Sequence, residues 1–99
     1  MDLDAFTGRK PRALPDWDPS MCRPLLFDAA LAREEAGPSF PSDLTPIAVF
    51  FRDDACTQLA DQWAFIAVDA AQGVFLVDDE GPRSLEQSLS EFLASLHAP

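Results

Sequence analysis

Apolar residues gather in three short runs along this chain, and these runs indicate where strands form. Residues 47–51, 63–68 and 74–77 are rich in β-branched and aromatic side chains, a pattern typical of buried strands. The polar break at residues 69–73 predicts a β-hairpin with a four- or five-residue loop, in which Gly73 can take a positive φ without steric cost. Because both strands of this hairpin are nearly continuous in apolar residues, we expect it at the centre of the fold.

Two further segments have the spacing of amphipathic helices. Residues 24–36 carry a leucine and alanine stripe, begin with Pro24 in the first turn and end before Gly37 and Pro38, which suits helix entry and exit. Residues 84–96 begin with Ser84 and Gln87, spaced as in a capping box. A single apolar stripe follows in this segment, formed by Leu85, Leu89, Phe92, Leu93 and Leu96.

These elements predict an α+β fold: a small, mostly antiparallel sheet of three or more strands packed against two helices. Residues 21–99 form the single domain, and residues 1–20, which contain three prolines, form an extended N-terminal arm. We expect apolar anchors to hold the arm and the loop at residues 39–46; these anchors are Leu3, Phe6, Leu14, Trp17, Phe40 and Leu44. Trp17 fits core packing, or alternatively an anchor inserted into a partner.

Charge narrows the set of partners. Seventeen acidic and seven basic residues give the chain a net charge of −10, which disfavours nucleic acid and anionic membranes and favours a basic partner. Residues 1–46 hold eight acids and five bases (−3), and residues 47–99 hold nine acids and two bases (−7). The acidity therefore falls mainly on the predicted sheet and its loops. Plain solubility remains an alternative explanation.

The residue types needed for catalysis and metal binding are sparse. The single histidine, His97, is the third residue from the end of the sequence, a poor place for a precisely held general base. The acidic pairs lack calcium-loop spacing, and Cys22 and Cys56 lack zinc-site spacing. We therefore expect no enzyme activity, no metal and no cofactor. With no signal peptide and no apolar run of 18 residues, we expect a cytoplasmic protein with reduced, mostly buried cysteines.

Acidic residues in the loops are the candidate partner contacts. Carboxylates at the ends of a sheet can speed association with a basic protein and fix its orientation. The candidates are Asp53, Asp54, Asp61, Asp69, Asp78, Asp79 and Glu80.

Two segments of the chain carry a recurring pattern. Ser88, Glu91, Phe92 and Leu93 form a "Ser-x-x-Glu-Phe-Leu" helix after paired strands, and within residues 34–44 Gly37 is followed four residues on by Pro41. These segments resemble the closing helix and the helix end of the SUKH superfamily. Typical members carry a further helix and an Asn-Gly turn where Thr45 and Pro46 here lead straight into a strand. The resemblance implies a bacterial immunity protein that binds and blocks a cognate toxin, with no shared catalytic residue.

The expected function is therefore that of an immunity or antitoxin-like protein, a monomer or weak dimer that occludes the active site of a basic toxin. Small toxins that act on nucleic acid are often basic, so an acidic inhibitor suits them electrostatically. The alternatives are an acidic secretion chaperone that holds an effector segment, usually as a dimer, and an accessory subunit of an enzyme.

Overall fold

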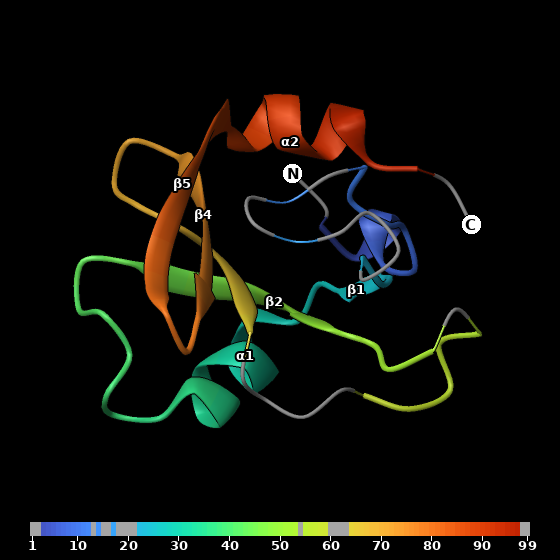
Figure 1. Ribbon diagram of the computed structural model, residues 1–99, viewed down its shortest axis with the longest axis horizontal. Coiled ribbons are helices and arrows are strands. Elements are labelled where there is room, and N and C mark those ends of the chain that lie inside the picture. The colour runs from blue at the N-terminus through green and yellow to red at the C-terminus, as the bar shows by residue number, and fades with distance from the viewer. Residues whose placement is uncertain are drawn as a thin grey trace.

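The described residues form one five-stranded antiparallel sheet with helices (Figure 1), which confirms the α+β fold that the sequence predicts. The computed structural model describes residues 3–12, 14, 17, 22–53, 55–59 and 64–97. Its strands are β1 (Leu25–Leu26), β2 (Thr45–Phe50), β3 (Phe65–Val68), β4 (Gly73–Asp78) and β5 (Gly81–Ser88), which lie side by side in that order. Its helices are the 3-10 helix η1 (Leu3–Phe6), α1 (Ala29–Ala36) and α2 (Leu89–Ser95).

The three predicted strands are confirmed as β2, β3 and β4, with shifted ends. Strand β2 begins two residues before the predicted start and includes Pro46, beside which its register with β3 shifts. Strand β3 is buried along its whole length, as expected for the centre of the fold. Of the predicted segment at residues 63–68, Trp63 lies outside the described residues.

The hairpin between β3 and β4 is confirmed, but its left-handed residue is not the glycine. Gln72 has φ 66°, whereas Gly73 has no positive φ and begins β4. The Asp69 carboxylate folds over the loop, and its Oδ1 accepts from the amides of Ala71 (3.0 Å) and Gly73 (2.8 Å). A Cβ on Gly73 would lie 3.3 Å from that oxygen. Glycine is therefore favoured at position 73 because the Asp69 carboxylate lies so close to it, and not because the backbone there requires a positive φ.

The predicted start of the second helix is wrong. Residues 81–88 form strand β5, which pairs with β4 from Asp78↔Gly81 to Gly73↔Ser88. The capping box lies four residues later than expected. The Ser88 hydroxyl accepts from the Glu91 amide (3.2 Å), and the Glu91 carboxylate accepts from the Ser88 amide (2.9 Å). Pairing with β4 thus overrides the local helix signal at Ser84.

The predicted start of the first helix is also wrong, although its end before Gly37 is confirmed. Helix α1 begins at Ala29, and its N-cap Asp28 accepts from the Leu31 amide at 3.0 Å. The two residues of β1 pair instead with Phe50 and Val49 of β2. The aspartate cap therefore sets this helix start, not the proline.

Each face of the sheet is covered differently. Phe92 and Leu93 of α2 belong to the large core cluster on one face, together with Ile66 and Leu76. On the other face, Ala32 of α1 packs in a smaller cluster with Val49 and Phe65. Figure 1 shows α2 running across one end of the β4–β5 hairpin and α1 lying beyond the opposite end. Helix α1 contacts β2 chiefly, so the second face is less fully covered over β4 and β5.

The described residues of the N-terminal segment pack against the domain. Leu14 is buried in the large cluster, and the other three expected anchors, Leu3, Phe6 and Trp17, pack against it. The backbone of this segment pairs with β1, since the Gly8 amide donates to the Leu25 carbonyl at 2.8 Å. Lys10 and His97 exchange backbone hydrogen bonds at 3.1 and 2.8 Å.

Candidate functional site

The predicted contact residues do not form one cluster. Asp69 lies in the loop between β3 and β4. Asp78 is the last residue of β4, and Asp79 and Glu80 form the turn from β4 to β5. These two groups are therefore at opposite ends of the same strand. Asp53 lies in the connection after β2. The remaining candidates, Asp54 and Asp61, fall outside the described residues.

Asp53 organises its own loop. Its carboxylate accepts from the amides of Thr57 (3.0 Å) and Gln58 (3.3 Å) and from the Thr57 hydroxyl. The Thr57 hydroxyl is the main reason that the pKa of Asp53 lies below its ordinary value, with the two amides adding to the effect and desolvation opposing it. This carboxylate is occupied by the loop, much as that of Asp69 is.

Asp78 is also committed to internal contacts. Its side chain is only 4% exposed and forms an ion pair with Arg83 of β5, whose side chain is 19% exposed. The Asp78 Oδ1 accepts from the Glu80 amide at 3.0 Å, which tightens the turn. The Asp78 Oδ2 lies 3.5 Å from the indole nitrogen of Trp17. The structure thus gives Asp78 a role in joining the turn, β5 and the N-terminal segment.

Asp79 and Glu80 are the described candidates that point most clearly to solvent. Both are exposed, and the Glu80 side chain is 72% exposed. Arg83 Nη1 lies 3.7 Å from the Glu80 carboxylate, but the same guanidinium is paired with Asp78. The turn therefore carries three carboxylates and Arg83 as its described cation, so it keeps a net negative charge.

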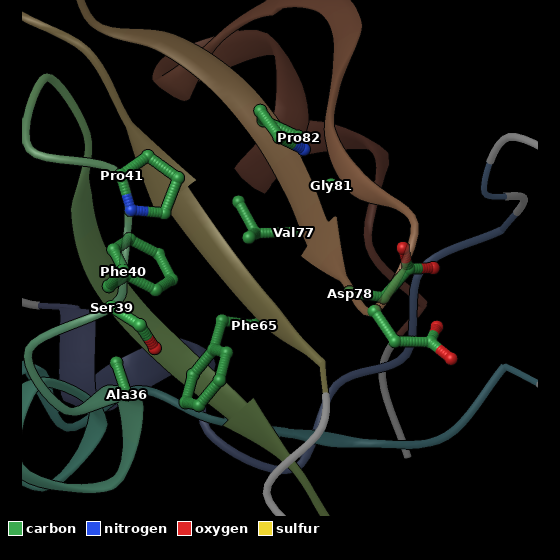
Figure 2. Close-up of a pocket in the computed structure, with 10 residues that line it drawn as sticks. Ala36, Ser39, Phe40, Pro41, Phe65, Val77, Asp78, Gly81 and Pro82 are labelled. Carbon is green, nitrogen blue, oxygen red and sulfur yellow. The ribbon is translucent and has the colours of Figure 1, made fainter.

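An open groove lies beside this turn on the less covered face of the sheet. It has a volume of about 370 Å³, near the lower end of the roughly 300–1,000 Å³ typical of ligand sites. One wall comes from the segment after α1 and the other from the β4–β5 turn; the lining residues include Ser39, Phe40, Pro41, Asp79, Gly81 and Pro82. Figure 2 shows Phe40 and Pro41 facing Val77 and Pro82 across this groove.

The floor of the groove belongs to the core and is held firmly. Phe65 and Val77 are buried at 6% exposure each, and they are directly opposite one another in the β3–β4 register. The Phe40 ring meets the Phe65 ring edge-on, with centroids 5.5 Å apart. Phe40 also packs against the small cluster that contains Val77. These contacts fix the apolar wall against the sheet without help from a ligand.

Phe40 and Pro41 also line a second hollow, of about 260 Å³. Its other residues include Arg33 of α1 and Leu44, which is buried as expected for a loop anchor. The two hollows therefore share Phe40 and Pro41 in their walls.

Few polar side chains line the first groove. Among the described residues lining the first groove, the polar ones are Ser39, Asp78 and Asp79, and Asp78 is held by Arg83. Among the described residues, no group of three or more His, Cys, Asp or Glu side chains is placed to hold a metal. None of the described helices is long and apolar enough to cross a membrane.

Sequence reasoning identified the acidic turn but not the groove beside it. The sequence indicates Phe40 only as a loop anchor and gives no role to Pro82. The groove depends on β5 folding back along β4, an element that the sequence pattern did not predict. Comparison of the chain with protein-family models, curated proteins and solved structures found no match.

Proposed function

We propose that this protein is an immunity or antitoxin-like protein, which binds a cognate basic toxin and blocks its active site. The observation that carries the proposal is the exposed acidic turn at Asp79 and Glu80 beside an open apolar groove. Apolar surface next to unneutralised charge is the composition of a protein-binding surface. The net charge of −10 would further speed the encounter with a basic partner.

Two features of the sequence favour a toxin as that partner. The resemblance of residues 88–93 to the closing helix of the SUKH superfamily suggests immunity proteins, and its first and fourth positions, Ser88 and Glu91, form the capping box of α2. The strong acidity suits a toxin that binds nucleic acid through basic residues. In this proposal the protein acts by occlusion in the cytoplasm and needs no catalytic group.

Within this proposal, the contacts of the acidic residues suggest which of them meet the partner. Asp79 and Glu80 are proposed to contact the partner directly. Asp78 supports them from within, because its carboxylate is held by Arg83 and Trp17. Asp53 and Asp69 add to the negative field, but their carboxylates stay engaged with their own loops.

The test is affinity capture from the native cells with the tagged protein, elution with salt and identification of what is released by mass spectrometry. The expected product is a folded basic protein that kills cells when expressed alone and is harmless when co-expressed with this chain. Capture of an unfolded segment of a secreted effector by a dimer would overturn the proposal in favour of a secretion chaperone. Capture of a non-toxic enzyme would favour an accessory subunit.

A further inference from the structure

The groove and the acidic turn form one continuous surface with two chemistries. Asp79 lines the groove and Glu80 follows it, while Val77 and Phe65 form the apolar floor. Pro82 stands on the same face of the sheet as Val77, because the two are directly opposite in the β4–β5 register. A ligand in the groove therefore contacts apolar surface at the floor and the carboxylates of Asp79 and Glu80 at one rim.

The rim is negative even after its internal contacts are counted. Arg83 is the described basic residue at the turn, and its guanidinium is paired with the buried carboxylate of Asp78. The Asp79 and Glu80 charges remain at the surface with only the more distant contact of 3.7 Å between Glu80 and Arg83. Charge complementarity thus calls for a Lys or Arg on the ligand, beside whatever fills the groove.

The size and shape of the groove set the remaining requirement. A volume of about 370 Å³ that is open to solvent suits one or two protein side chains better than a cofactor, which needs several converging polar groups. Large aromatic and aliphatic residues are the usual anchors in such pockets.

We propose that this groove receives a single bulky apolar side chain from a surface loop of the folded partner, while a Lys or Arg next to it pairs with Asp79 and Glu80. This rests on the proposed function and specifies the partner element that the protein recognises. The apolar side chain contacts Phe40, Pro41, Val77 and Pro82. The cation selects partners by charge and sets the orientation of the loop.

The groove can be tested without the natural partner, using two short peptides. The probes are acetyl-Gly-Lys-Trp-Lys-Gly-amide and acetyl-Gly-Glu-Trp-Glu-Gly-amide, titrated into the ¹⁵N-labelled protein at low salt and followed by NMR. We expect saturable shifts of the Phe40, Val77 and Gly81 amides with the lysine peptide, with a Kd on the order of 1 mM. The glutamate peptide should bind at least about fivefold more weakly.

Substitutions at exposed positions test the apolar groove and the acidic rim separately. Ser39→Trp places a large ring at the groove wall and should abolish the shifts, whereas the control Ser90→Trp, on exposed Ser90 of α2, should leave them unchanged. Asp79→Lys should remove the preference for the lysine peptide, and the charge-matched control Glu35→Lys on α1 should retain it. Each variant is first checked for an unchanged fold by its NMR spectrum.

Two results would overturn the inference: shifts of the same size in Ser39→Trp as in the parent protein, or equal affinity of the parent for both peptides. The proposed function is judged separately, by neutralisation of the captured toxin in cells. If Ser39→Trp and Asp79→Lys still neutralise the toxin fully, the groove proposal is wrong and the immunity proposal stands. If the parent protein protects no cell, the immunity proposal fails, whatever the peptides show.

Discussion

The indole nitrogen of Trp17 lies 3.5 Å from the Asp78 carboxylate, to which it donates across 61 positions of sequence. The Trp17 ring also packs on Phe50 of β2, with ring centroids 5.2 Å apart. Because Asp78 is paired with Arg83 as well, this one carboxylate links the N-terminal segment to both strands of the last hairpin. The acidic turn is therefore supported from the interior of the protein.

Asp78→Ala should lower the free energy of unfolding by about 3 kcal/mol, because it leaves the mostly buried Arg83 guanidinium without its main counter-charge. Denaturation in urea, followed by tryptophan fluorescence, measures the change. The control is Asp79→Ala, since Asp79 is exposed and one position away; its effect should stay within about 0.5 kcal/mol. Equal effects of the two substitutions would contradict a supporting role for Asp78.

Ser88→Ala should destabilise the protein by about 1 kcal/mol, the usual cost of removing an N-cap hydroxyl. The hydroxyl accepts from the Glu91 amide at the start of α2. Ser90→Ala, inside the helix and exposed, is the matched control and should be neutral or slightly stabilising, since alanine is the better helix former. Thermal unfolding followed by circular dichroism compares the two variants. A larger loss of stability for Ser90→Ala than for Ser88→Ala would contradict the assignment of Ser88 as the N-cap.

The contribution of Glu91 should depend on pH. Its hydrogen bond from the Ser88 amide, with the Ser88 hydroxyl as a second cause, holds the pKa of Glu91 below the ordinary glutamate value of 4.5. A lowered folded-state pKa adds stability above the ordinary value, and this stability is lost as pH falls through the lowered pKa. Glu91→Gln keeps a neutral acceptor at all pH values. The Tm of the parent should therefore fall relative to that of Glu91→Gln below about pH 4.5, and parallel curves would refute the effect.

Asp79→Lys with Glu80→Lys should slow association with the captured partner by about tenfold at low ionic strength, with a smaller effect in roughly 0.5 M salt. Asp78 is left intact, because reversing its charge would disrupt the ion pair with Arg83. A loss of stability would then be mistaken for a loss of partner binding. Stopped-flow or surface-based kinetics measure the rate. Glu34→Lys with Glu35→Lys changes the charge equally on exposed positions of α1. If both double variants slow binding equally, net charge alone governs the encounter.

The central strands could be predicted because their sequence leaves little choice. Residues 65–68 are apolar at every position and buried at every position, so no amphipathic alternative competes. Strand β5 could not be predicted in this way. Leu85 is its one large apolar residue, and Ser84 with Gln87 mimics a helix start. Its conformation comes from pairing with β4, a long-range effect that a local pattern does not contain.

The candidate site, too, could be predicted from the sequence only in part. The acidic turn could be located from Asp78, Asp79 and Glu80 in sequence, but their separate roles could not. Val77 forms part of the groove floor, the Asp78 carboxylate is held by Trp17 and Arg83, and the turn leaves Asp79 exposed. These separate roles depend on the register between β4 and β5, which a local sequence pattern does not contain.

Strand β5 lies at one edge of the described sheet, where exposed backbone groups could recruit a strand from another molecule. Two features of β5 work against such recruitment. Pro82 has no amide hydrogen to offer, and Glu86, at φ 56°, breaks the regular extension within the stretch where the register shifts. The consequence is protection from aggregation: the edge resists cross-β growth, even though the neighbouring apolar strands have the composition that favours it.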